Sequence, residues 1–188
     1  LFLTNRLIAK RSGWDGILSA YSNNDMLLGN EPDRLATHLL KLGAIITAYQ
    51  EKNYSQVISN MSMKIRSNED KRRISAFLND TLTDPTKTID SVINEFNKQH
   101  ILVVDDRLTE YITNNEERYN KAKDLPISQV LAYYAYYNNY SPYSTQHGIK
   151  GAEFDNVLVV LDNGRWNNDN FKYYFEETEG KDSVVNRT

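Results

Sequence analysis

The chain has 188 residues, of which 40% are hydrophobic and 25% charged, a composition typical of a folded globular protein. Its net charge of −3 excludes a surface covered throughout in positive charge for nucleic-acid binding, but it allows a local basic groove. Cysteine is absent, which excludes disulfides and thiolate metal sites and fits an intracellular protein.

Signals for membranes, metals and secretion are weak. No apolar run approaches the roughly 18 residues needed to span a bilayer, so we expect no membrane partner. The three histidines lie far apart in the sequence and give a metal site little support. The chain begins at Leu1 without a basic leader, so we expect no signal peptide and a cytoplasmic location. Because it does not begin with methionine, we also expect it to be a piece of a longer protein.

Residues 1–25 begin with a very short apolar segment. Leu1–Thr4 predicts the end of a β-strand, and Asn5–Arg11 predicts one or two helical turns before Gly13. Arg6 stands out in this turn as a possible functional residue. The favoured interpretation is an ordinary surface arginine, because arginines are mostly exposed.

Residues 26–140 change to helical periodicity. Pro32 suits a first helical position, with Glu31 beside it to complement the helix dipole. Ser67 predicts a helix cap, and Asp84-Pro85 predicts a boundary between two helices. The pattern therefore predicts an all-helical block of roughly 110 residues. Apolar residues at helical spacing in it include Leu35, Leu39, Leu42, Ile46, Val57, Ile58, Ile74, Leu78, Ile89, Val92, Ile93 and Phe96.

The segment His100–Asp106 combines four apolar residues with paired carboxylates, as in a strand that holds magnesium beside a nucleotide. However, the sequence contains no Gly-x-x-x-x-Gly-Lys-Ser/Thr loop to hold the phosphates. The favoured alternative is that Asp105 or Asp106 caps a helix starting at Arg107.

The densest basic run lies between positions 64 and 73. One interpretation is contact with the backbone of duplex DNA, and the other is a solvated helix face offset by Glu69 and Asp70. The second is favoured, because charge runs on helices usually face water. The basic residues are Lys64, Arg66, Lys71, Arg72 and Arg73.

Residues 133–143 contain six tyrosines. Aromatic rings can stack on the bases of single-stranded DNA. Adjacent tyrosines on a helix point to different faces, so most are expected to bury their rings and keep the hydroxyl in water. One or two would remain for DNA, and Tyr143 is the best placed.

The stretch 144–162 contains the densest motif of the chain. A polar loop with two glycines, a histidine, a lysine and a glutamate leads into the unbroken apolar segment Val157–Leu161. That segment predicts a strand buried on both faces. A polar loop against a buried strand is where α/β proteins often place their chemistry.

Residues 145–154 read Thr-x-His-x-x-Lys-Gly-x-Glu-Phe and fill every fixed position of that pattern. They resemble motif V of superfamily 1 helicases of the UvrD/Rep/PcrA type, which lies in the second RecA-like domain. The resemblance at residue level covers positions 145 to about 161. Such helicases carry a helical subdomain, called 2B, before motif V, and residues 26–140 match it in position and character.

The resemblance implies roles for individual residues. Glu153 would reach the ribose of the nucleotide, and Gly151 would shape the loop between DNA and nucleotide. Thr145 and His147 are expected on the single-strand track. Lys150 is also counted as DNA-binding, although its charge suits the phosphates of either the DNA or the nucleotide, and Tyr143 is added because it lies close to the motif. No catalytic residue and no metal ligand is expected in this chain.

We therefore expect a mixed α/β fold, with partial RecA-like strands at both ends and a large, mainly helical insertion. Residues 1–25 would begin the second RecA-like domain, residues 26–140 would be the 2B-like insertion, and residues 141–188 would return to that domain.

The parent protein would be an ATP-dependent DNA helicase that uses ATP and Mg²⁺. Its partners would be single-stranded DNA, a duplex junction and the first RecA-like domain of the same parent. The alternative is a non-catalytic DNA- or protein-binding module. The chain alone is predicted to be inactive, because the phosphate-holding Walker A loop and motif VI are missing from it.

Overall fold

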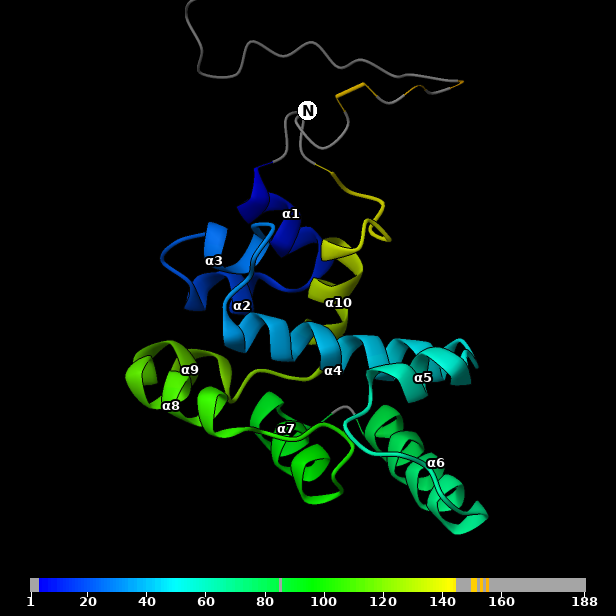
Figure 1. Cartoon of the computed structure of the whole chain (residues 1–188). Coiled ribbons are helices and arrows are strands. Elements are labelled where there is room, and N and C mark those ends of the chain that lie inside the picture. The colour runs from blue at the N-terminus through cyan, green and yellow to red at the C-terminus, as the bar shows by residue number, and fades with distance from the viewer. Residues whose placement is uncertain (1–3, 85, 145–149, 152, 154, 156–188) are drawn as a thin grey trace, which may run out of the picture.

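The longest helix of the described chain lies at its centre, and the other helices surround it (Figure 1). The computed structural model describes residues 4–84, 86–144, 150, 151, 153 and 155. Its helices are α1 (Asn5–Ser12), α2 (Asp15–Ala20), α3 (Asp25–Leu28), α4 (Arg34–Gln50), α5 (Tyr54–Asn60), α6 (Asn68–Thr83), α7 (Ile89–Lys98), α8 (Asp106–Asn114), α9 (Glu116–Ala122) and α10 (Ser128–Tyr137).

The central helix α4 begins one residue after Asp33. The Asp33 carboxylate accepts a hydrogen bond from the backbone N–H of Ala36 at 2.8 Å, which satisfies a donor that a helix start leaves free. The helix therefore begins at Arg34, and the prediction that Pro32 occupies its first position is wrong. The predicted apolar face is confirmed, because Leu35, Leu39, Leu42 and Ile46 are all buried.

Apart from α5, the remaining helices lie on two sides of α4 in Figure 1. Helices α1, α2, α3 and α10 lie on one side, and α6, α7, α8 and α9 lie on the other. Gly43 allows α10 to approach closely, because a Cβ at this position would lie 2.6 Å from the Cβ of Tyr134. Trp14 and Phe96, from opposite ends of this arrangement, belong to one hydrophobic core.

The prediction of a mixed α/β fold is wrong. Across residues 4–84 and 86–144 the chain is helical, and the β-structure there is confined to an isolated bridge between Thr88 and Pro126. Of the predicted strand Leu1–Thr4, only Thr4 is described, and it belongs to no strand. Its side chain caps α1 by accepting a hydrogen bond from the N–H of Leu7 at 3.3 Å. The second predicted strand, Val157–Leu161, lies outside the described residues.

The helix boundaries predicted within the helical block are mostly correct. Ser67 forms a capping box with Asp70 at the start of α6. Asp105 caps α8 by accepting from the N–H of Leu108 at 2.8 Å, which confirms the capping interpretation of the paired carboxylates. The segment from residue 101 to Asp105 is a loop rather than a strand. The magnesium interpretation requires a strand that ends at the paired carboxylates. This segment is a loop and Asp105 caps a helix, so that interpretation is not supported.

Candidate functional site

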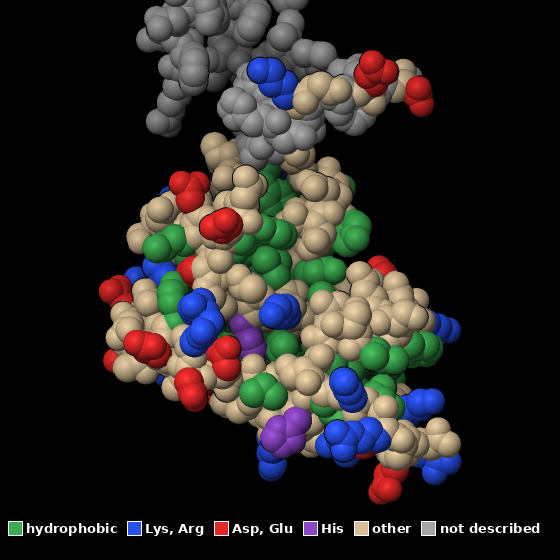
Figure 2. Space-filling model, viewed as in Figure 1, with side chains coloured by type: hydrophobic (Ala, Val, Ile, Leu, Met, Phe, Trp, Pro, Cys, Tyr) green, Lys and Arg blue, Asp and Glu red, His purple; other side chains and the backbone are tan. Residues whose placement is uncertain are grey.

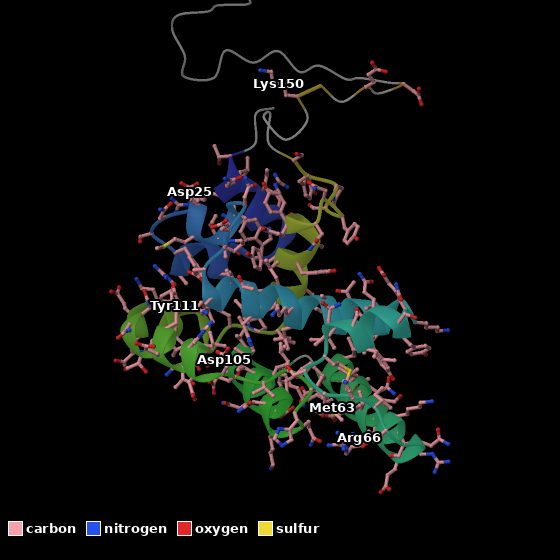
Figure 3. All side chains as sticks on the ribbon, in the orientation of Figure 1. Asp25, Met63, Arg66, Asp105, Tyr111 and Lys150 are labelled. Atoms are coloured by element: carbon pink, nitrogen blue, oxygen red, sulfur yellow. The ribbon has the colours of Figure 1, made fainter. Side chains whose placement is uncertain are left out.

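The motif residues fall partly inside and partly outside the described chain. Thr145 and His147 lie outside it, so their predicted DNA roles stay predictions. Lys150, Gly151 and Glu153 are exposed. Figure 3 shows Lys150 apart from the helical body that carries the other labelled residues.

Gly151 has a backbone conformation that favours glycine. Its φ of 85° lies in the left-handed region, and a Cβ added there would meet nothing within 4 Å. The conformation of the backbone, rather than a close neighbour, therefore explains glycine at this position.

Several tyrosines near the end of the helical block pack into the fold, as predicted, but the prediction that their hydroxyls stay in water is wrong. Tyr133 is buried and donates its hydroxyl to the carbonyl oxygen of Leu27 at 2.6 Å. Burial raises the pKa of Tyr133, which keeps this donor protonated. Tyr136 stacks on Trp14 with ring centres 4.9 Å apart. The hydroxyls of these residues and of Tyr137 bond protein groups in the α1–α3 region, so they are not free for DNA.

Two tyrosines of this stretch remain accessible. Tyr140 is 68% exposed and Tyr143 is 38% exposed. The backbone N–H of Tyr143 donates to the Oγ of Ser141 at 3.2 Å, and the ring is left available. Tyr143 therefore has the exposure that base stacking requires.

The basic run around α6 is exposed, as a solvated face would be. Figure 2 shows Lys and Arg side chains gathered over this end of the molecule, and Figure 3 labels Arg66 there. Arg73 is occupied within the fold, because it donates to Gln99 at 2.9 Å and lies 3.7 Å from Asp70. Arg6, on α1, is also exposed, as the surface interpretation predicted.

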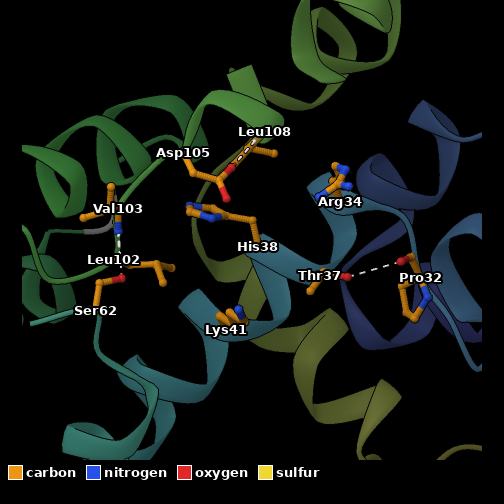
Figure 4. Close-up of a pocket in the computed structure, with 10 residues that line it drawn as sticks. All are labelled: Pro32, Arg34, Thr37, His38, Lys41, Ser62, Leu102, Val103, Asp105 and Leu108. Atoms are coloured by element: carbon orange, nitrogen blue, oxygen red, sulfur yellow. Dashed lines mark hydrogen bonds between the residues drawn. The ribbon is translucent and has the colours of Figure 1, made fainter. Parts of the chain in front are cut away.

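The sequence did not predict a pocket of about 510 Å³ between the first half of α4 and the loop that leads into α8 (Figure 4). Its polar lining comes from these two elements and from the loop after α5. The polar and charged lining residues are Arg34, Thr37, His38, Lys41, Ser62 and Asp105. The four α4 residues are spaced at i, i+3, i+4 and i+7, so they share one face of the helix. That spacing was the signal available in the sequence.

His38 is the most buried of these polar residues. It is 6% exposed, and its Nε2 is buried without a hydrogen-bond partner among the described residues. Desolvation and then the nearby Lys41 charge lower the pKa of His38 to about 4, against the opposing effect of Asp105. His38 is therefore neutral at pH 7.

The opposite wall of the pocket is held by hydrogen bonds between distant segments. Ser62 donates its backbone N–H to the carbonyl of Ile101 at 2.8 Å. Its Oγ accepts from the N–H of Val103 at 3.1 Å. These two bonds attach the loop before α8 to the loop after α5, so the wall is a built feature of the fold.

Within the described residues, no group of three or more His, Cys, Asp or Glu side chains is arranged to hold a metal ion. Among the helices of that same part of the chain, none has the length and apolarity needed to cross a membrane.

Comparison with known proteins gives one distant similarity. The chain is 24% identical over 227 residues to Gabija protein GajB of Bacillus cereus (strain HuB5-5). The match covers 94% of this chain and 33% of that protein, so the chain spans about a third of the length of this curated relative. No protein-family model matches the chain. No solved structure matches it either.

Proposed function

We propose that this chain is part of an ATP-dependent DNA helicase or translocase that moves on single-stranded DNA and separates duplex strands. The observation that carries the proposal is the Thr-x-His-x-x-Lys-Gly-x-Glu-Phe pattern of residues 145–154, in which every fixed position is filled. The distant similarity to Gabija protein GajB agrees with a helicase-related chain and extends over nearly all of it.

In this proposal the motif joins two binding sites of the parent protein. Thr145, His147 and Lys150 contact phosphates of the DNA strand, since hydroxyl, imidazole and ammonium groups are suitable donors. Glu153 accepts a hydrogen bond from the nucleotide ribose, with Gly151 shaping the loop between the two sites. Lys150 and Glu153 are exposed, as groups that bind ligands across a cleft need to be.

In this proposal the helical block, residues 26–140, is the 2B-like insertion. Helices α4 to α10 fill residues 34–137, which supports this assignment in character. ATP and Mg²⁺ act in the intact parent together with its first RecA-like domain. A non-catalytic binding module is the second candidate, because the 188 residues contain no phosphate-holding Walker A loop.

The test uses the intact parent protein. His147→Ala should reduce the ATP hydrolysis that single-stranded DNA stimulates much more than it reduces the basal rate. Phosphate contacts carry no sequence information, so DNA binding should tolerate any sequence and weaken steeply with salt. His100 gives a matched control, since it is exposed and its φ of 56° suits asparagine, so His100→Asn should leave both rates unchanged.

Two outcomes would count against the helicase proposal. One is equal loss of both rates in His147→Ala with unchanged affinity for single-stranded DNA. The other is an intact parent without DNA-stimulated ATP hydrolysis at all, which would favour the binding module.

A further inference from the structure

The pocket beside α4 presents two positive side chains to solvent. Arg34 and Lys41 are exposed on the same face of the helix, separated by two turns or roughly 10 Å along its axis. Figure 4 shows both beside the opening, with His38 between the helix and the opposite wall. The spacing leaves room for a group that contacts both charges.

The negative charge in the lining is smaller. Among the described lining residues Asp105 is the lone carboxylate, against the two cations Arg34 and Lys41. One of its oxygens accepts from the N–H of Leu108 as the cap of α8. His38 adds no charge at pH 7, because its pKa is lowered to about 4. The lining is therefore net positive.

Neutral hydrogen-bonding groups complete the site. The Oγ of Ser62 accepts from Val103 N–H, so its own hydroxyl proton is directed elsewhere and can be donated. The Thr37 hydroxyl already donates to the carbonyl of Pro32 at 3.2 Å and is less available. His38 lines the pocket, but its Nε2 is buried and has no partner in the described part of the chain, so the imidazole reports on the pocket without bonding the ligand.

We propose that this pocket binds a phosphate group, with Arg34 and Lys41 opposing its charge and Ser62 donating a hydrogen bond. An arginine fork and a lysine point charge together suit a multiply charged, tetrahedral anion. The volume of about 510 Å³ exceeds a single phosphate, so the group belongs to a larger molecule or binds with water. The two sources with this chemistry are a free phosphate compound and the backbone of a nucleic acid.

The experiment follows the imidazole of His38 by NMR in ¹³C-labelled protein, with ionic strength held constant. Pyrophosphate is the free probe, and a short duplex oligonucleotide without terminal phosphates is the backbone probe. At least one of the two probes should shift the chemical shift of the His38 imidazole, and the change should level off as the pocket is saturated. Arg34→Gln and Lys41→Gln should each weaken binding about tenfold, since each removes a charged hydrogen-bond donor.

Asp105→Asn gives a test of opposite sign. Asparagine caps helices as well as aspartate, so α8 is kept while the opposing charge is removed. Affinity should rise severalfold. Lys10→Gln is the matched control, because Lys10 is exposed on α1 and does not line the pocket, and it should change nothing.

The pattern of responses separates the two sources. A His38 shift with pyrophosphate assigns the pocket to a free phosphate compound, and a shift with the duplex alone assigns it to a nucleic-acid backbone. If neither probe moves the signal, or if Lys10→Gln weakens binding as much as Arg34→Gln, the proposal is overturned. None of the pocket residues that the structure describes belongs to the motif at residues 145–154, and the two tests use different readouts, so either can fail without the other.

Discussion

Asp33 and Arg118 form a buried ion pair that joins the start of α4 to α9. The Oδ2 of Asp33 lies 3.1 Å from the Nη1 of Arg118, and the two side chains are 7% and 13% exposed. Asp33 also accepts from Tyr111 at 2.8 Å and from Tyr21 at 3.1 Å, while its Oδ1 caps α4. A single carboxylate thus connects α4 to three other parts of the fold.

Asp33→Asn tests this pair because asparagine keeps the helix cap and removes the charge. The variant leaves the Arg118 guanidinium buried without its anion, so the free energy of unfolding should fall by about 3 to 5 kcal/mol. Urea denaturation measures the loss. Lys121→Gln is the control, since the Lys121–Glu117 pair is largely exposed and should contribute well under about 1 kcal/mol. Similar effects from the two variants would contradict the assignment.

Tyr133→Phe isolates one buried hydrogen bond. The substitution keeps the ring and leaves the carbonyl of Leu27 without its donor, so stability should fall by about 1 to 2 kcal/mol. Tyr140→Phe serves as the control, because the ring of Tyr140 is 68% exposed, and its stability should be unchanged. Thermal or urea unfolding of both variants checks the difference.

Gly43→Ala separates helix propensity from packing. Alanine favours a helix interior over glycine by about 1 kcal/mol, which alone would stabilise α4. The added Cβ would instead lie 2.6 Å from Tyr134, so we expect a loss of about 1 to 3 kcal/mol as α10 is displaced. A stability gain in urea denaturation would show that α10 does not pack this closely.

The stability of the fold should depend on pH through His38. Its pKa is about 4 in the folded chain against 6.5 for the ordinary group, so the folded state disfavours the charged form. Above pH 6.5 neither state binds the proton, and between these values only the unfolded state does. Stability should therefore fall as the pH drops from 6.5 toward 4, by roughly 3 kcal/mol in total.

His38→Gln should flatten that part of the curve relative to the unsubstituted chain. The charges near His38 are Lys41 on its own helix and Asp105 on the opposite wall, and both are kept in this variant. An unchanged slope in His38→Gln would refute the burial of a neutral imidazole.

Glu153→Gln tests the nucleotide side of the proposed function in the intact parent. The amide loses the charge and half of the acceptor capacity, so ATP affinity or the coupling of hydrolysis to DNA should weaken while the fold is kept. Asp155→Asn is the neighbouring control, because Asp155 is also exposed and is not among the residues assigned to nucleotide binding. An unchanged ATPase profile in Glu153→Gln would argue against the ribose contact.

Local signals in the sequence determined most of the helices. The cap at Ser67, the cap at Asp105 and the apolar spacing of α4 and α7 each depend on residues three or four positions apart. A helix start satisfies its free N–H groups within one turn, so the sequence alone contains the information. The helicase-like motif was likewise readable from ten consecutive positions, 145–154.

Long-range contacts decided the rest. The pocket requires Ser62 and Asp105 to meet His38 from other segments, and the Asp33–Arg118 pair joins residues 85 positions apart. Periodicity shows which face of a helix is buried, but which side chains meet there depends on tertiary packing, which only the structure supplies.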